Sequence, residues 1–420
     1  MNILTDDVKI LIRKLAIPAS VGTLFQTLYN IVDTFFAGKI SPEALSALAK
    51  SFPIYFILIA SSIGITVAGT SLIGNSIGEK NQKKASTYFS QLIIFSLILT
   101  LFITYIGLAY SDNVFMLMGS SDEVKNLGLD YTNIIFYGSF LFIVVVALNS
   151  LLHAEGDTKT YRNALIIAFL LNIFLNPILI FGFWFIPAFG MKGIGIATLI
   201  AQLVSLIIIF DKVLKSKLIK NLIINNFIPK IYYFKNIFFQ SMPIIISICG
   251  YSVASAIVFK YAGLSGEYAA AGYGAGTRIE QVVLLPILGI NTAIITIIAQ
   301  NFGAKNILRI KQTYITAIKY AFIIMIISSL FVYFLAEIIT GLFSNDLNVI
   351  EFGNYFVETL EDNENTFKMF AAQLFGLAHI NSYKNKHMKN AVILFATAII
   401  CELIIIMLMT WGLTYNELFN

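Results

Sequence analysis

Charged side chains are scarce in this chain. Asp, Glu, Lys and Arg make up 12% of its 420 residues, whereas 58% of the residues are hydrophobic. A soluble domain carries about 25% charged residues, and a single core of this size cannot bury so much apolar surface. The composition therefore excludes an ordinary soluble globular protein.

Cysteine and histidine are rare as well. Cys249 and Cys401 both lie inside apolar segments, where small buried residues are expected rather than a disulfide. The three histidines, His153, His379 and His387, do not have the spacing of metal ligands. The sequence also lacks a phosphate-binding glycine loop and a nucleophile triad. It therefore predicts neither an enzyme nor an ATP-driven pump, and it requires no cofactor.

Long apolar runs are the main positive feature. Each strong run is long enough to cross a bilayer as a helix, which needs about 20 residues. The strong runs are 14–37, 52–77, 88–110, 131–152, 163–183, 191–210, 237–262, 273–300, 313–341 and 391–413. A weaker one lies around 366–380. We therefore predict an all-α polytopic membrane protein with ten or eleven transmembrane helices.

The basic residues are distributed unequally between the two sides of this arrangement. Twenty-one of the 28 Lys and Arg residues precede the first run or lie in alternate connections. The opposite connections contain five, which are Lys39, Lys50, Lys125, Lys192 and Lys260. Because basic loops stay in the cytoplasm, we predict a multi-pass protein of the cytoplasmic (inner) membrane with a cytoplasmic N-terminus. The net charge of +5 then belongs to a cytoplasmic face and does not indicate nucleic-acid binding.

An internal repeat at an offset of 225 residues relates two halves of the chain. The pairs without a gap include Pro18 and Pro243, Gly64 and Gly289, and Gly78 and Gly303. Fixed-offset identity at Gly and Pro indicates a duplicated structural unit. Six runs precede the basic linker at 211–236, so the halves are expected to be parallel, as in many secondary transporters. We predict an N-terminal six-helix lobe at 1–210 and a C-terminal lobe at 237–420.

The C-terminal lobe does not repeat the first one completely. The offset maps the fourth run onto 356–377, which contains several charged residues, and it maps the sixth run beyond residue 420. We therefore expect the plan of six plus six helices to be incomplete in the second bundle. The lobe is predicted to be divergent or truncated after about residue 355.

Asp33 is the first candidate for a functional residue. It lies inside the first apolar run, where a charged side chain costs about 2.5–3.5 kcal/mol on insertion scales. Gln26, Tyr29 and Asn30 precede it at helical spacing, so we place all four on one face directed at a cavity or a partner helix. We interpret Asp33 as a proton or Na⁺ site and the other three as cleft residues. The alternative is a carboxylate that only fixes helix packing.

Polar residues of later runs are candidate partners for Asp33. Asn172 and Asn176 are one helical turn apart, and Pro177 frees a backbone carbonyl. Their amides can hydrogen-bond an acid or bind Na⁺, although packing between helices is an equally good interpretation of either one alone. Tyr137 and Thr198 are weaker candidates for the same pocket. Apart from this possible Na⁺, no metal is expected.

The second half does not repeat this cluster. The offset counterparts are Val258 for Asp33, Thr397 for Asn172 and Cys401 for Asn176. A purely architectural cluster would more naturally be repeated, so the predicted ion site belongs to the N-terminal lobe. Glu402 is a further acid midway along the last strong run, where a role in the cleft and exposure to water are equally good interpretations.

A linked series of motifs resembles the multidrug and toxic-compound extrusion (MATE) family of cation-coupled antiporters, over about residues 1–355. The motifs are Pro18 to Gly38, Ser51-Phe52-Pro53, Ala154-Glu155-Gly156-Asp157, Asn172 to Pro177, Gly193 to Thr198, Arg278 to Gly289 and Asn301 to Lys305. The resemblance implies two six-helix bundles around a V-shaped cleft and export driven by H⁺ or Na⁺. It assigns coupling to Asp33, with Asn172, Thr198 and Tyr137 beside it. Many relatives have a second aspartate at the position of Asn176.

Together these observations predict an antiporter that exports amphipathic, cationic organic compounds as a monomer among membrane lipids. Ion exchange at Asp33 would bias bending of the first helix at Pro18 between two states. A flippase for lipid-linked oligosaccharides is the alternative, although Arg278 and Lys368 are few cations for a pyrophosphate. A third possibility is a membrane protein that no longer transports after losing its C-terminal helix.

Overall fold

The computed structural model describes residues 1–222, 224–264 and 267–341. These residues form two compact units. Unit 1 comprises Met1–Cys249 and Leu284–Ile323, and the described part of unit 2 comprises 250–264, 267–283 and 324–341. The expected boundary between lobes at 211–236 therefore stays a prediction. Glu402 and the runs at 366–380 and 391–413 lie outside the described residues.

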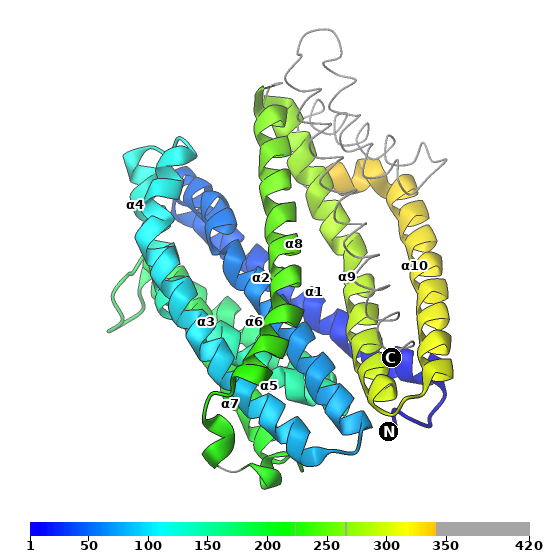
Figure 1. Ribbon diagram of the computed structural model, residues 1–420. Helices are drawn as coiled ribbons and strands as arrows, with labels where there is room; N and C mark the ends of the chain where they lie inside the picture. Colours follow the sequence, from blue (N-terminus) through cyan, green and yellow to red (C-terminus); the bar gives the residue numbers. More distant parts are fainter. Residues whose placement is uncertain (223, 265–266, 342–420) are drawn as a thin grey trace. The chain divides into compact units, whose positions relative to one another are not determined.

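Ten α-helices account for nearly all of the described chain (Figure 1). They are α1 Val8–Ile40, α2 Pro42–Gly78, α3 Gln82–Leu117, α4 Asp122–Tyr137, α5 Ser139–Glu155, α6 Lys159–Phe181, α7 Met191–Leu214, α8 Ile231–Leu264, α9 Glu267–Gly303 and α10 Ile307–Gly341. Two short 3₁₀ helices, η1 Ile219–Asn221 and η2 Ile224–Phe227, lie between α7 and α8. Within the described ranges, the only β-type pairing is an isolated bridge between Phe183 and Ile186.

The helices confirm the prediction of a helical membrane protein. Six of the described helical segments are long and apolar enough to cross a bilayer, and the number rises to seven if α4 and α5 form one bent span. Helices dominate because they satisfy their own backbone hydrogen bonds where water is absent. Every strong run before residue 342 coincides with described helices except at Gly138 and at Gly182 and Phe183, which follow α6.

The fourth apolar run differs from its prediction as a single helix. It is divided into α4 and α5, which meet at Gly138 and are bent by 44°. A Cβ atom at Gly138 would lie 2.1 Å from Leu199 Cδ2 on α7. The break therefore lies where α7 approaches the backbone so closely that a side chain does not fit. A hydropathy pattern contains no information about this contact.

Side-chain caps mark where several helices begin. Asp7 accepts hydrogen bonds from the backbone N–H groups of Lys9 and Ile10 at 2.8 and 3.2 Å at the start of α1. Ser41 and Asn81 do the same for α2 and α3. These residue types are preferred at this position because their oxygens satisfy N–H groups that have no partner within the helix.

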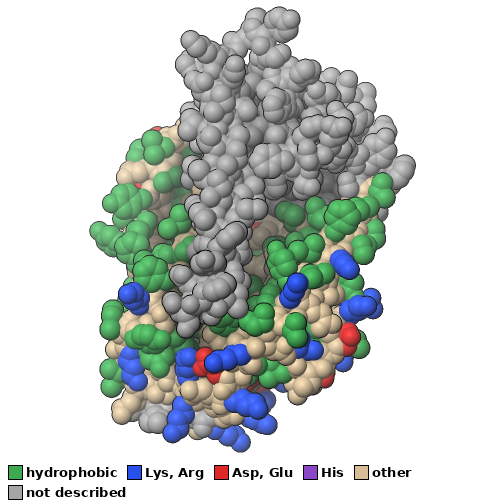
Figure 2. Space-filling view, turned by 45° about the vertical axis from the view of Figure 1, so that its right-hand side comes forward, with side chains coloured by type: hydrophobic (Ala, Val, Ile, Leu, Met, Phe, Trp, Pro, Cys, Tyr) green, Lys and Arg blue, Asp and Glu red, His purple; other side chains and the backbone are tan. Residues whose placement is uncertain are grey.

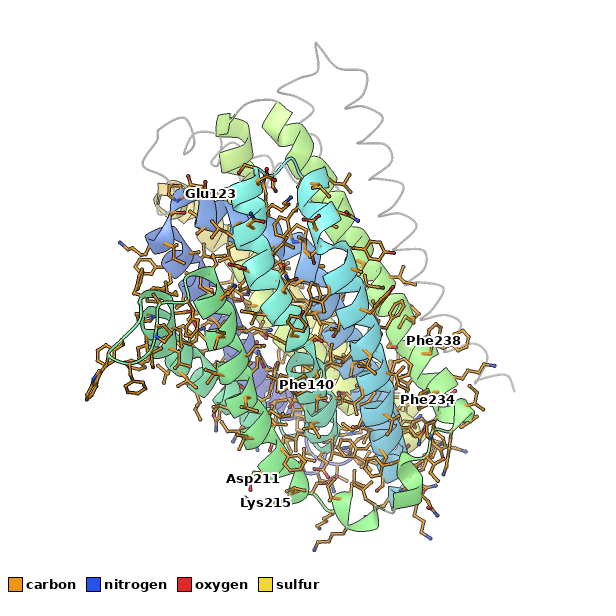
Figure 3. All side chains as sticks on the ribbon, turned by 90° about the vertical axis from the view of Figure 1, so that its left-hand side faces the viewer. Glu123, Phe140, Asp211, Lys215, Phe234 and Phe238 are labelled. Carbon is orange, nitrogen blue, oxygen red and sulfur yellow. The ribbon has the colours of Figure 1, made fainter. Side chains whose placement is uncertain are left out.

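Basic side chains gather at one end of unit 1 on the face drawn in Figure 2. On the face in Figure 2, Lys and Arg side chains gather at the lower end, with hydrophobic side chains above them. Figure 3 shows Asp211 and Lys215, which form an ion pair at 2.5 Å, at this lower end of α7. Glu123 lies at the upper end, on α4. Basic side chains are therefore concentrated at the lower end of this face of unit 1.

Candidate ion-coupling site

Asp33 is a buried carboxylate in the middle of unit 1. Its side chain lies on α1 and is only 4% exposed. Among the described residues, no Lys, Arg or His forms an ion pair with it. A buried carboxylate without a cationic partner is costly unless hydrogen bonds or a bound cation compensate for its lost hydration.

Both oxygens of Asp33 accept hydrogen bonds from neighbouring helices. Oδ1 accepts from the side-chain amides of Asn172 and Asn176 on α6, at 3.1 and 2.9 Å. Oδ2 accepts from the hydroxyl of Thr198 on α7, at 3.2 Å. Asn176 also donates to Oδ1 of Asn172 at 3.0 Å. The structure therefore brings together four residues that the sequence analysis had singled out.

Two glycines permit this convergence of helices. A Cβ atom at Gly22 on α1 would lie 3.3 Å from Arg162 Cα on α6. A Cβ atom at Gly193 on α7 would lie 2.6 Å from the carbonyl oxygen of Leu179 on α6. Both crossings involve backbone that cannot move aside easily. Small residues are typical where membrane helices approach this closely.

The hydrogen bonds of Thr198 allow a proton to be accommodated on Asp33. The Thr198 hydroxyl can donate either to Asp33 or to the carbonyl oxygen of Ile194, which lies 3.0 Å away. When its hydrogen turns to Ile194, the oxygen can accept a hydrogen bond from a protonated Asp33. Both protonation states of the acid can therefore be hydrogen-bonded without moving a helix.

The site offers few oxygen acceptors that could bind a metal ion. Within the part of the chain that the structure describes, Oδ1 of Asn176 is a buried acceptor without a hydrogen-bond partner, and no group of three His, Cys, Asp or Glu residues could hold a metal. Oxygen-binding cations prefer several oxygen ligands at once. The two oxygens of Asp33 already accept hydrogen bonds, and only Oδ1 of Asn176 and the buried hydroxyl of Tyr29 are without a hydrogen-bond partner among the described residues of this site.

Three tyrosines lie near the carboxylate of Asp33. The charge of Asp33 acts electrostatically on the hydroxyl groups of Tyr29, Tyr55 and Tyr131. The rings of Tyr55 and Tyr131 contact edge to face, with centroids 6.0 Å apart. Tyr29 is buried one helical turn before Asp33. Its hydroxyl has no hydrogen-bond partner among the described side chains.

Tyr131 is the buried tyrosine of α4, whereas the sequence predicts Tyr137 beside Asp33. Tyr137 is 68% exposed and lies at the end of α4, whereas Tyr131 is 4% exposed. Helical spacing contains the signal that distinguishes them. The buried residues of α4 include Val124, Gly128, Tyr131 and Ile135, which recur every three or four positions. Tyr137 does not fall on this stripe.

The two tyrosines of α4 provide a matched pair of variants. We expect Tyr131→Phe to reduce transport roughly fivefold, since it removes a buried hydroxyl near Asp33 and a polar interaction of this kind contributes about 1 kcal/mol. Tyr137→Phe removes the same atom from an exposed ring and should leave the rate unchanged. Initial rates in liposomes measure both. Equal rates for the two variants would contradict a role for Tyr131.

The remaining candidates fall into two groups. Pro18 is buried within α1, where it removes a backbone donor from the helix. Gln26 and Asn30 are exposed, unlike Tyr29 and Asp33. The face of α1 that the sequence predicts is therefore divided into two adjoining strips. Tyr29 and Asp33 form the buried strip, which packs on α6, and Gln26 and Asn30 form the exposed strip. Each strip joins residues four positions apart, as helical geometry requires.

Comparisons with known proteins agree with this structure. The MatE family model matches residues 18–178 and 243–360. The two matches begin 225 residues apart, at the offset of the internal repeat. A protein named FAD transporter from Shewanella oneidensis is 25% identical over 347 residues, which cover 82% of this chain and 76% of that protein. A probable multidrug resistance protein, YoeA of Bacillus subtilis, is 25% identical over 342 residues, which cover 78% and 72% of the two chains.

Solved structures lead to the same grouping. An outward-facing multidrug resistance MATE family transporter of the MOP superfamily superimposes with a TM-score of 0.80 and 27% sequence identity. The superposition covers 94% of this chain and 86% of that one. The fold, the duplicated sequence match and the family model together leave one conclusion. This chain belongs to the MatE family of membrane transporters.

Proposed function

We propose that this protein is a cation-coupled antiporter that exports amphipathic organic cations across the cytoplasmic membrane, and that Asp33 is its coupling site. The observation that carries the proposal is the chemistry around Asp33. A buried carboxylate is held by three neutral donors, and no cationic side chain in the described part of the chain pairs with it. An acid in this setting can gain and lose a small cation.

The hydrogen-bond pattern favours H⁺ over Na⁺ as the coupling ion. Thr198 has an alternative acceptor, so it can serve either protonation state of Asp33. A bound Na⁺ would instead have to displace donors from the carboxylate and recruit further oxygens. Asn176 also stands where many relatives have a second aspartate, so a single carboxylate would carry the exchange.

Coupling would act through the attachment of α1 to α6 and α7. Proton binding changes the hydrogen bonds between Asp33 and residues on both helices, and α1 contains Pro18 fifteen positions earlier. Helices bend most readily at proline. If Asp33 binds a cation more tightly in one conformation of α1, cation binding shifts the population towards that conformation.

Several features support export of organic cations from the cytoplasm. Relatives of this chain are named multidrug resistance proteins, and aromatic residues, which attract organic cations through their ring faces, make up 14% of the chain. The basic lower end of unit 1 supports a cytoplasmic N-terminus. We further propose that the protein acts as a monomer among membrane lipids and needs no cofactor besides its coupling ion.

Reconstituted liposomes test this proposal directly. The purified full chain is placed in vesicles loaded with a fluorescent organic cation, and either a pH gradient at equal Na⁺ or a Na⁺ gradient at equal pH is imposed. We expect the pH gradient to drive movement of the dye. Movement only with the Na⁺ gradient would replace H⁺ by Na⁺, and no movement with either gradient would contradict the antiporter.

A flavin dinucleotide is a second candidate substrate because one relative is named FAD transporter. FAD is an anion at neutral pH, so its transport would require a cleft of different charge from one that accepts organic cations. The same vesicles, loaded with FAD and monitored by flavin fluorescence, distinguish the two. Movement of FAD without movement of the organic cation would favour the dinucleotide.

A further inference from the structure

The connection between α6 and α7 carries an exposed aromatic hairpin. It runs from Gly182 to Gly190 and includes Trp184 and Phe185, which are 92% and 81% exposed. Figures 1 and 3 both show this thin loop projecting sideways from unit 1, at a lower level than the α4 end that carries Glu123. An aqueous loop of this length would normally be polar.

The hairpin has a defined backbone rather than a loose one. Phe183 and Ile186 exchange two backbone hydrogen bonds of 3.0 and 2.9 Å. The N–H groups of Phe189 and Gly190 then donate to the last free carbonyls of α6, on Leu179 and Ile180, at 2.9 and 3.2 Å. Because so many of its backbone groups are paired internally, the hairpin can enter an environment that is poor in water.

Trp184 adopts a backbone conformation that its side chain does not favour. Its φ angle is +52°, in the region where glycine or asparagine is usual in tight turns. Such a conformation is strained and persists only when the surroundings compensate for it. The backbone hydrogen bonds of the hairpin hold this turn, but the ring is almost fully exposed and gains little from contacts with the described part of the chain.

The length of α6 places the hairpin at the edge of the membrane. The segment from Asn163 to Met191 contains no charged residue, and the basic residues Arg162 and Lys192 flank it. The apolar part of α6, from Asn163 to Phe181, spans about 28 Å at 1.5 Å per residue, close to the hydrocarbon thickness of about 30 Å. By contrast, α2 and α3 have 37 and 36 residues and extend further.

The exposed face of α6 continues into the hairpin. This face consists of Ile167, Leu170, Phe174 and Phe181, all exposed and spaced at helical intervals. It lies away from Asn172 and Asn176, which are buried against Asp33. An exposed apolar stripe on a transmembrane helix faces lipid. The aromatic tip is therefore the end of a lipid-facing surface.

We propose that the Gly182–Gly190 hairpin is a membrane anchor, whose Trp184 and Phe185 rings insert among phospholipids at the non-cytoplasmic interface. Aromatic rings favour this depth because their apolar faces contact acyl chains while the indole N–H reaches polar groups. The anchor fixes the end of α6, the helix whose two asparagines hold Asp33. The anchor depends on properties that all phospholipid interfaces have in common, and it does not require a particular headgroup.

Fluorescence quenching of Trp184 tests the anchor. The full chain is reconstituted in vesicles of phosphatidylethanolamine and phosphatidylglycerol that contain phosphatidylcholine brominated at shallow or at deep acyl positions. Since Trp184 and Trp411 are the only tryptophans, the difference between the wild type and Trp184→Phe isolates Trp184. The phenylalanine retains an aromatic ring, so this variant is expected to fold normally.

We expect the shallow bromines to remove more than half of the Trp184 fluorescence and the deep bromines to remove less. Aqueous iodide should have little effect. Efficient quenching by iodide without quenching by bromolipid would place the hairpin in water and overturn the proposal. Bromolipid quenching that appears only after strong dilution of the protein in lipid would show that a second copy of the chain covers the hairpin, which also overturns it.

Discussion

Replacing Asp33 by Asn is expected to abolish transport driven by an ion gradient. The amide cannot exchange a proton near neutral pH, so the cycle loses its coupling step. The fold should survive, because the new Oδ1 can accept from Asn172 and Asn176 as before. The new amide can donate to Thr198, whose hydroxyl still has Ile194 as an acceptor. Dye efflux from liposomes with an imposed pH gradient measures the effect.

Asp211→Asn is the matched control for this variant. Asp211 is an exposed acid that pairs with Lys215 on the surface of α7. An exposed ion pair contributes about 0–1 kcal/mol to stability, so efflux should remain at the wild-type rate. Efflux that continues in the Asp33→Asn protein at a wild-type rate would remove Asp33 from the mechanism. Asp33→Glu, which retains an ionisable group, should preserve part of the activity.

Gly78→Ala is expected to destabilise the protein severely, although alanine normally favours a helix. A Cβ atom at Gly78 on α2 would lie 1.9 Å from the backbone oxygen of Gln300 on α9. A Cβ atom at Gly303 would likewise lie 1.9 Å from the backbone oxygen of Asn75. These two contacts are related by the 225-residue repeat. Because backbone atoms cannot rotate away, the helices must separate, and overpacking of this kind costs about 1–3 kcal/mol or more.

The stability of Gly78→Ala can be compared with that of Gly38→Ala. At Gly38 the nearest atom to an added Cβ would be Leu45 Cδ2, at an ordinary distance of 3.8 Å. The control should therefore be neutral or stabilise the helix by about 0.5–1 kcal/mol. The fraction of detergent-solubilised protein that stays monodisperse after heating measures both variants. Equal survival of the two proteins would show that the α2–α9 crossing tolerates a side chain.

Much of the ion site could be predicted from the sequence because helical periodicity determines which residues share a face. Asn172 and Asn176 are four positions apart, so their side chains lie on the same face of any helix that contains both. Periodicity does not determine which side chains a neighbouring helix covers. The spacing of the buried residues on α4 distinguishes Tyr131 from Tyr137, whereas the exposure of Gln26 and Asn30 depends on how neighbouring helices pack against α1.

The sequence by itself determined the class of protein, its helical runs and its duplication. These follow from local properties, since the partition of a segment into lipid depends on its own side chains, and a repeat requires only a comparison of the chain with itself. Tertiary structure decided which of the candidate donors contact Asp33 and which glycines contact the backbone of another helix. Asp33 and Thr198 are 165 positions apart. Their contact depends on how closely three helices can approach one another, and no single segment of the sequence determines that distance.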